Sequence, residues 1–167
     1  LIWVRDNSRL LHDMKGKPEY FDADLEDITE ERNSQLAVKK NEANLKAIIE
    51  NTLENIWSVN RNYEIQYVNE VFASSFQQTF GTLLKPGVNV IQALPGFLKP
   101  IWKERYDRAF KNEHYLFEDK IDINDTSIYI EVAMKPIVID GSVVGISAYG
   151  KNETKKKQSQ IQLQYQS

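Results

Sequence analysis

The sequence contains no cysteine and only two histidines, His12 and His114. The first absence excludes disulfides, thiolate metal ligands and every mechanism that needs a cysteine nucleophile. It agrees with a reducing compartment, and we expect a cytoplasmic location. A run of about 18 apolar residues is also missing, so we expect no membrane contact in this stretch of chain.

An excess of basic residues is lacking as well. The chain has 21 Lys and Arg residues against 24 Asp and Glu, a formal net charge of −3. Proteins that bind nucleic acid through its phosphates usually carry excess positive charge, and only the run 155–157 is strongly basic here. We therefore expect no nucleic-acid partner.

Common catalytic motifs do not occur. Neither histidine lies near a Gly-x-Ser-x-Gly elbow, and the sequence has no Walker-type or Gly-x-Gly-x-x-Gly loop. Carboxylate pairs such as Glu118 with Asp119 fall in strand or turn positions, where a solvated face is the usual explanation. We predict no catalytic residues and no metal ligands, and we expect that the chain is not an enzyme.

A repeated layout organises the residues that are present. Residues 16–29 and 141–154 each contain a glycine turn, an apolar strand and an Asp/Asn-x-Thr step into a charged helical run. The chain therefore ends two similar units but contains only one complete unit. We divide it into residues 1–29 as the C-terminal strands of a truncated upstream domain, 30–55 as a signalling helix, 56–152 as the complete domain, and 153–167 as the start of an exit helix.

The segment 30–55 has the pattern of one long helix. It follows a capping-box sequence at Asp27 to Glu30, and neither Gly nor Pro interrupts it. Val38, Leu45 and Thr52 recur at the heptad spacing, which is typical of a seam against a partner helix. Packing on the chain's own domain explains the same pattern. The first interpretation implies a homodimer that forms through this helix, and the second does not.

From residue 56 onward the pattern changes to short strands separated by turns. Residues 56–68 predict a hairpin, Asn69 caps a helix that begins with residues 70–76 and is closed by Gly81, and a second amphipathic helix follows. Three longer strands complete the unit, with a strong hairpin signal at Asp140-Gly141. This order predicts the α+β class, with a single five-stranded antiparallel sheet, helices on one face, and a long N-terminal helix before it.

The order of elements resembles the PAS family, and the local sequence agrees. Residues 55–72 are similar to the family's first hairpin and helix, although Asn60 stands where Asp is usual. Asp27-Ile28-Thr29 resembles the Asp-Ile-Thr motif that ends PAS domains and leads into a signalling helix. Asn152-Glu153-Thr154 departs from that motif, which implies a more weakly capped exit helix.

The resemblance implies a sensory and dimerisation module of a signal-transduction protein. Such modules commonly precede a histidine kinase or a cyclic-di-nucleotide enzyme, so the parent protein is expected to be a sensor histidine kinase of a two-component system. The module would relay a small-molecule or conformational signal to an output domain of the same chain. The implied exit residues are Asp27, Thr29, Asn152 and Thr154.

An apolar pocket under the connecting helix is the first candidate site. If the residue before Asn60 faces inward, as in PAS relatives, strand alternation places Trp57 and Val59 on the same inner face. The same side chains would equally form a filled core, which would make the module a purely structural dimer relay. The candidate residues are Trp57, Val59, Phe72, Phe76, Trp102, Tyr106, Phe110, Phe117, Ile130, Val132, Met134 and Ile146.

A cofactor site is the other alternative. PAS relatives that form a flavin adduct use a cysteine, so its absence excludes that photochemistry. Haem-binding relatives use a histidine on or just after the connecting helix, and His114 lies near that place. A haem-binding or other cofactor-binding sensor that uses His114 is therefore the alternative function.

Overall fold

The computed structural model describes residues 1–111 and 114–166, with the exception of the Tyr115 side chain. The chain divides into two compact units, Leu1–Ile48 and Ile49–Ser167. In the described residues, no helix combines the length and the hydropathy needed to cross a membrane.

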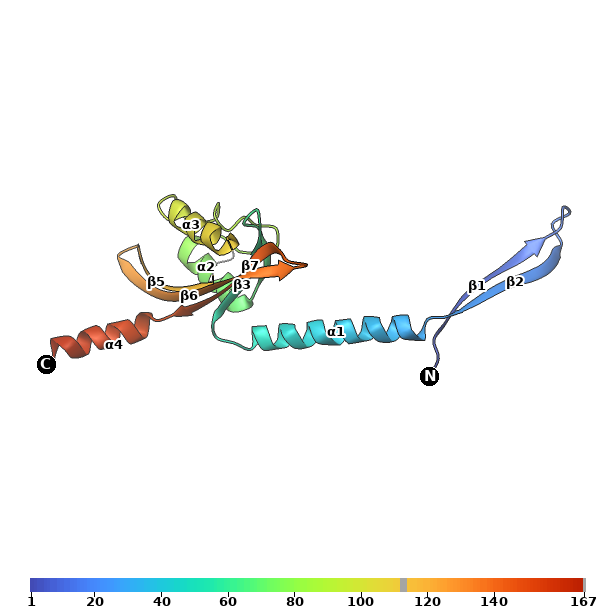
Figure 1. Ribbon diagram of the computed structural model, residues 1–167, viewed down its shortest axis with the longest axis horizontal. Coiled ribbons are helices and arrows are strands. Elements are labelled where there is room, and N and C mark those ends of the chain that lie inside the picture. The colour runs from blue at the N-terminus through green and yellow to red at the C-terminus, as the bar shows by residue number, and fades with distance from the viewer. Residues whose placement is uncertain (112–113, 167) are drawn as a thin grey trace. The chain divides into compact units, whose positions relative to one another are not determined.

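The first unit begins with a β-hairpin. Strands β1 (Val4–His12) and β2 (Pro18–Asp27) pair antiparallel, with Gly16 at φ 77° in the turn. Helix α1 (Thr29–Glu50) follows directly (Figure 1). The predicted fold class, which named only a long helix before the domain, is therefore corrected: a hairpin precedes that helix, in the residues 1–29 where the repeated layout predicted strands.

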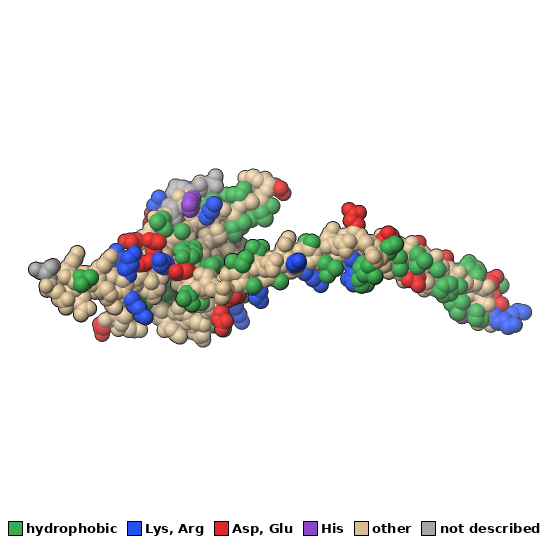
Figure 2. All heavy atoms as spheres, turned by 90° about the horizontal axis from the view of Figure 1, so that it is seen from below, with side chains coloured by type: hydrophobic (Ala, Val, Ile, Leu, Met, Phe, Trp, Pro, Cys, Tyr) green, Lys and Arg blue, Asp and Glu red, His purple; other side chains and the backbone are tan. Residues whose placement is uncertain are grey.

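Both strands of the hairpin are exposed, and hydrophobic side chains are visible among charged ones on their surface (Figure 2). Phe21 and Leu25 are each 65% exposed. A two-stranded ribbon has no second layer to cover such side chains. The hairpin therefore contributes no core of its own.

Helix α1 ends at Glu50, although its sequence pattern extends to about Asn55. The hydroxyl of Thr52 accepts a hydrogen bond from the backbone N–H of Glu54 at 3.2 Å. Such local side-chain bonds offer the backbone an alternative to the helical ladder. The chain turns here and enters the sheet of the second unit.

The second unit contains one five-stranded antiparallel sheet, as the sequence predicted. Its spatial order is β4-β3-β7-β6-β5, so the β3–β4 hairpin lies beside β7, the last strand in the sequence (Figure 1). The strands are β3 (Asn55–Asn60), β4 (Ile65–Val68), β5 (Tyr115–Ile123), β6 (Thr126–Ile139) and β7 (Ser142–Asn152).

Helices α2 (Glu70–Phe80) and α3 (Lys99–Phe110) lie on one face of this sheet, and α4 (Thr154–Tyr165) follows β7 (Figure 1). Asn69 caps α2, and Gly81 ends it at φ 80°. The helix thus ends at Gly81, where the sequence predicted its end. The hydrophobic core fills the space between the sheet and these helices, with contributions from the connector after α2.

Asn69, whose side chain is completely buried, connects the start of β3 with the start of α2. Its Oδ1 accepts from the backbone N–H of Ile56 at 3.0 Å and of Phe72 at 3.2 Å, and its Nδ2 donates to the carbonyl oxygen of Glu54 at 2.8 Å. Buried polar groups are stable only when they are bonded in this way. One amide thereby fixes the start of β3 against the start of α2.

The end of α1 is bonded to β4 within the second unit. Glu50 accepts from the Tyr67 hydroxyl at 2.6 Å and from the backbone N–H of Glu70 at 3.0 Å. Burial, and then the hydrogen bond to the Glu50 carboxylate, raise the pKa of Tyr67 to about 12. The neutral phenol is therefore the form that the folded state favours.

A pH dependence follows from this raised pKa. The stabilisation is complete below the unfolded tyrosine pKa of about 10 and is lost as the pH rises towards 12. We expect the free energy of unfolding to fall over this interval, and Tyr67 should contribute a late step to the tyrosinate absorbance. A Tyr67→Phe variant serves as the control, since it should lose the contribution of Tyr67 to both changes. Equal titration curves for the two proteins would contradict the assignment.

Candidate functional site

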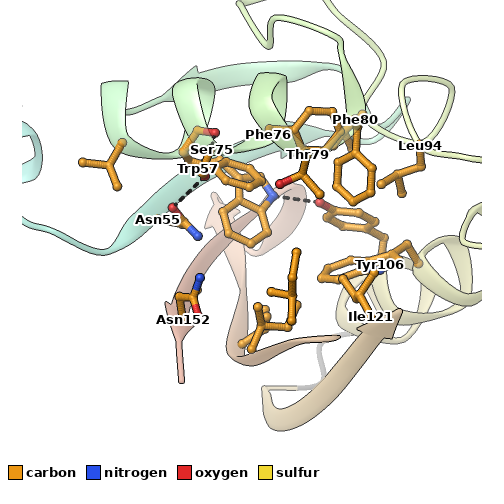
Figure 3. A pocket seen from close by; sticks show the side chains of 18 of the residues that line it. Asn55, Trp57, Ser75, Phe76, Thr79, Phe80, Leu94, Tyr106, Ile121 and Asn152 are labelled. Atoms are coloured by element: carbon orange, nitrogen blue, oxygen red, sulfur yellow. Dashed lines mark hydrogen bonds between the residues drawn. The ribbon is translucent and has the colours of Figure 1, made fainter. Parts of the chain in front are cut away.

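A cavity of about 310 Å³ lies between the inner face of the sheet and helices α2 and α3 (Figure 3). This volume is at the lower end of the range of about 300–1,000 Å³ that small-molecule pockets occupy. Six aromatic rings form much of its wall. They belong to Trp57, Phe72, Phe76, Phe80, Trp102 and Tyr106.

Trp57 on β3 is the central wall residue. Its indole Nε1 donates to the hydroxyl oxygen of Tyr106 on α3 at 2.7 Å, and its ring lies 4.2 Å from that of Phe72 on α2. Gly150 on β7 leaves room for this ring, because a Cβ there would lie 3.2 Å from Cζ3 of Trp57. The absence of a side chain at this position therefore helps to fix the shape of the cavity.

The electrostatic character of the cavity is neutral. None of the described lining residues is an Asp, Glu, Lys, Arg or His. Polar groups come instead from Asn55, Ser75, Thr79 and Asn152, and the Asn55 Oδ1 accepts from the Ser75 hydroxyl at 3.3 Å. An ion buried without a partner is strongly destabilised. The site is consequently suited to an uncharged molecule with a few hydrogen-bonding atoms.

Trp102 carries a further polar atom at this wall. Its Nε1 is buried and has no hydrogen-bond partner among the described residues. Trp102 packs edge-on against Phe117, whose ring also lies 4.1 Å from the Arg105 guanidinium carbon. An unsatisfied buried donor costs about 1–3 kcal/mol, so an acceptor that reached it would be favoured.

The predicted wall residues fall into two groups. The cavity is lined by Trp57, Phe72, Phe76, Trp102, Tyr106, Ile130 and Val132. The other predicted residues lie in the core outside it, fully buried for Val59, Met134 and Ile146 and partly buried for Phe110 and Phe117. The cavity thus takes up one part of the sheet's inner face, while the rest is filled core.

Several lining residues were not predicted from the sequence. Thr79 and Phe80 continue the spacing of Ser75 and Phe76 by one helical turn, so the periodicity of α2 was a usable signal. Val90 and Leu94 lie on the connector, which is neither a helix nor a strand and so has no inner face that periodicity could identify. The full set that was missed comprises Leu53, Asn55, Val71, Ser75, Thr79, Phe80, Val90, Leu94, Ile121, Ile128 and Gly150, with Asn152 predicted only as an exit residue.

His114 lies in the segment between α3 and β5 and is exposed. It does not belong to the residues that line the cavity. The described part of the chain also contains no cluster of three or more His, Asp or Glu side chains placed to hold a metal ion. The haem alternative therefore has no observation in its favour.

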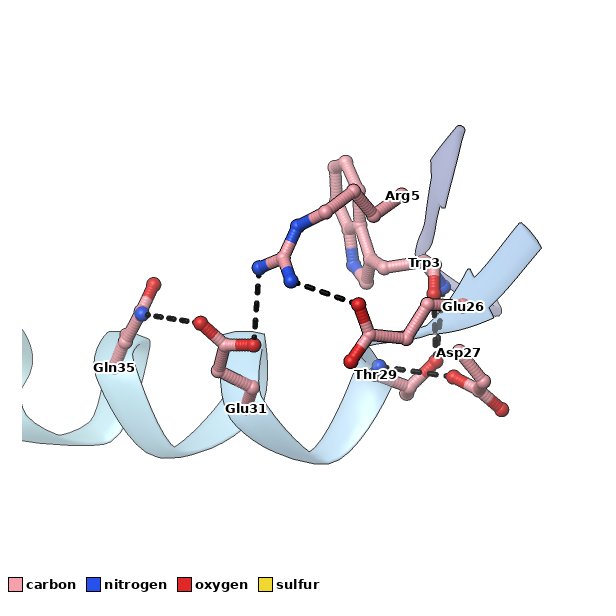
Figure 4. Close-up of polar contacts among 7 residues, drawn as sticks. All are labelled: Trp3, Arg5, Glu26, Asp27, Thr29, Glu31 and Gln35. Carbon is pink, nitrogen blue, oxygen red and sulfur yellow. Dashed lines mark hydrogen bonds and ion pairs between the residues drawn. The ribbon is translucent and has the colours of Figure 1, made fainter. Parts of the chain in front are cut away.

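The predicted exit residues meet in two hydrogen-bonded clips, one at the junction of β2 with α1 and one at the junction of β7 with α4. In the first clip, the Thr29 hydroxyl accepts from the backbone N–H of Trp3 at 2.9 Å, and the Asp27 carboxylate accepts from the Thr29 N–H at 2.9 Å (Figure 4). The Ile28 N–H donates to the Trp3 carbonyl oxygen at 2.9 Å. Hydrogen bonds from Thr29 hold the pKa of Asp27 below its usual value.

The second clip repeats these three bonds at the end of the complete unit. The Thr154 hydroxyl accepts from the Tyr129 N–H at 3.0 Å, and Asn152 Oδ1 accepts from the Thr154 N–H at 3.0 Å. The Glu153 N–H donates to the Tyr129 carbonyl oxygen at 2.8 Å. Each clip connects the strand before the helix, the start of the helix, and a second segment, which is Trp3 just before β1 in the first clip and Tyr129 of β6 in the second. The repeated layout of the sequence thus has a counterpart in the hydrogen bonds.

Comparison with known proteins identifies the fold. No protein-family model and no curated protein matches the chain. Among solved structures, the PAS domain of Bordetella pertussis BvgS aligns with a TM-score of 0.58 at 14% identity, covering 75% of this chain and 95% of that one. The chain therefore has the PAS domain fold, as the sequence resemblance predicted.

Two further structures support this assignment. A phage VqmA–DPO complex aligns with a TM-score of 0.54 at 11% identity, covering 78% of this chain and 62% of that one. A sensory box histidine kinase/response regulator from Burkholderia thailandensis aligns with a TM-score of 0.50 at 10% identity, covering 73% and 93%. The chain is thus similar in structure to PAS sensory domains of kinases and other signalling proteins.

Proposed function

We propose that the second unit is a sensory module that binds a small uncharged ring compound in the cavity behind Trp57. The observation that carries this proposal is a cavity of about 310 Å³ that has an aromatic wall and no Asp, Glu, Lys, Arg or His among its described lining residues. An engineered cavity of roughly 150 Å³ binds benzene, so this one has room for about two fused rings. The VqmA structure, which aligns with this chain, is a complex with DPO, and this supports a ligand-binding role.

A matched pair of probes tests this proposal. We expect 2-naphthamide to stabilise the protein and 2-naphthoate, which has nearly the same shape but a negative charge, to have little effect. At ten times its Kd, a ligand adds about 1.4 kcal/mol of stability, which corresponds to a Tm increase of roughly 4 °C for a domain of this size. Equal responses to both probes, or to neither, would contradict a selective neutral pocket.

A cavity-filling variant tests the location. Thr79 lines the cavity, whereas Gln78 beside it on α2 is exposed. We expect Thr79→Phe to reduce 2-naphthamide affinity at least tenfold because the new ring occupies the space. Gln78→Phe should leave the affinity unchanged, as measured by tryptophan fluorescence titration. Similar affinities for the two variants would place the binding site elsewhere.

The role in signalling extends this proposal. The chain would act as a non-catalytic sensor in the cytoplasm and relay pocket occupancy to an output domain of the same protein, for example a histidine kinase. Similarity to the Burkholderia thailandensis structure supports this assignment. The position of α4 supports it too, since the helix leaves directly from the clip at the end of β7.

We also infer a homodimer that forms through α1. Val38, Leu45 and Ile48 lie on one side of this helix and are more than half exposed. We expect Leu45→Asp to shift the protein towards monomer in sedimentation experiments, because it places a charge in the seam. The matched control is Ala43→Asp, an exposed position on the opposite side of the helix. Identical association states for wild type and both variants would contradict this interface.

The origin of the hairpin is a separate inference. Residues 1–29 repeat the clip bonds of the complete unit, yet Phe21 is 65% exposed while Ile146, its counterpart on β7, is fully buried. This contrast supports the view that the hairpin is the end of an upstream domain of the same fold. In a longer chain with the natural preceding sequence, the β2 amides should become protected from hydrogen exchange. Unchanged exchange would oppose the inference.

A further inference from the structure

Asn152 belongs to the cavity and to the exit clip at the same time. It lines the cavity, and its Oδ1 accepts from the backbone N–H of Thr154 at the start of α4. That bond defines which end of the amide is which, because only the oxygen accepts. The Nδ2 end of the side chain is therefore left as a donor.

The amide nitrogens of Asn152 and Asn55 have no hydrogen-bond partner in the part of the chain that the structure describes. Their amide groups point toward one another at one end of the cavity, away from Leu94 and Ile121 (Figure 3). Two N–H donors at the end of an apolar, neutral space select a ligand with an oxygen acceptor there. A carbonyl oxygen on a ring compound has the required chemistry.

The other clip provides a comparison within the same chain. Asp27 occupies the corresponding place there and accepts from the Thr29 N–H at 2.9 Å, compared with 3.0 Å for Asn152 and Thr154. A carboxylate thus holds the helix start as well as an amide does. An amide, however, can accept from the helix and donate to a ligand at once, whereas an ionised carboxylate only accepts. Of the two residues, therefore, only Asn152 has a side-chain N–H donor that a ligand can use.

We propose that Asn152 couples ligand binding to the exit helix: its Nδ2 binds the carbonyl oxygen of an uncharged ring compound while its Oδ1 holds Thr154. This proposal rests on the proposed function and adds the ligand's acceptor group and the route of the signal. A ligand shifts a conformational equilibrium only if it binds one state more tightly. The ligand's carbonyl oxygen binds one state more tightly here, since it favours the conformation of the Asn152 side chain that also bonds the first turn of α4.

Asn152→Asp is the decisive variant. The Asp27 clip shows that a carboxylate keeps the bond to the helix, so the fold and α4 should be retained. The donor is lost, and the added charge faces the ligand's oxygen. We expect 2-naphthamide to bind the wild-type chain and to bind Asn152→Asp at least about tenfold more weakly. The control is Asn62→Asp, the same change at an exposed turn position, which should bind like wild type.

Hydrogen exchange measures the coupling. In the wild-type chain, saturating 2-naphthamide should slow exchange of the first-turn amides of α4 roughly threefold or more. Without the probe, Asn152→Asp should exchange there as the wild type does. Equal affinity of both proteins, or α4 exchange that ignores the probe, overturns the proposal and leaves the proposed function intact. Failure of the wild-type chain to bind the probe overturns the proposed function itself.

Discussion

Replacing Asn69 with alanine is expected to lower the free energy of unfolding by about 3 kcal/mol, as measured by urea denaturation. The side chain is fully buried and bonds the N–H groups of Ile56 and Phe72 and the carbonyl oxygen of Glu54. Each buried group left without a partner costs about 1–3 kcal/mol, and the loss of a helix cap alone costs about 1 kcal/mol. The cost is large because no solvent reaches the site to replace these bonds.

Asn89→Ala is the matched control for this prediction. Asn89 also caps a turn, accepting from the Gln92 N–H at 3.0 Å and donating to the Asn62 carbonyl oxygen at 3.0 Å. These bonds lie at the surface, where water can satisfy the groups that are left. We expect a loss of about 1 kcal/mol or less. Similar losses for the two variants would show that the Asn69 amide does not join β3 to α2 as described.

Gly145→Ala is expected to destabilise the second unit by at least about 3 kcal/mol. Gly145 on β7 pairs with Asn60 on β3, and a Cβ there would lie 2.5 Å from the carbonyl oxygen of Val59. That oxygen belongs to the backbone of the neighbouring strand, so relief of the clash requires the two strands to separate. Overpacking that moves side chains alone typically costs about 1–3 kcal/mol, and a backbone clash costs more.

Gly150→Ala provides the comparison on the same strand. Its added Cβ would meet the Trp57 ring at 3.2 Å, and a ring edge can move by a few tenths of an ångström. We expect a loss of about 1 kcal/mol together with weaker binding of the neutral probe, because the wall of the cavity shifts. If Gly145→Ala were as stable as Gly150→Ala, β3 and β7 would not be packed in the observed register.

The sheet could be predicted from the sequence because its signals are local. Strand alternation and the Asp140-Gly141 turn identify β6 and β7, and both turn residues have the positive φ angles, 50° and 77°, that this hairpin type requires. The repeated layout also predicted a strand pair before α1. Local signals did not predict that α1 ends at Glu50. This end depends on the hydrogen bond from the Glu54 N–H to the Thr52 hydroxyl.

The cavity could be predicted only in part. Trp57, Phe72 and Trp102 follow from strand and helix periodicity, which identifies the inner face of each element. Periodicity cannot distinguish a residue that faces a cavity from one that faces filled core. The predicted cavity wall therefore also contained Val59 and Met134. The connector residues that close the cavity belong to no helix or strand, so their positions depend on tertiary packing.

The most direct test of the account is the position of the bound neutral probe. Intermolecular NOEs between 2-naphthamide and the methyl groups of the wild-type chain would report it. We predict contacts to Leu94, Ile121 and Ile130, which line the cavity from a connector and two strands. Contacts confined to exposed methyl groups, such as those of Leu10 or Leu163, would contradict a ligand site between the sheet and its helices.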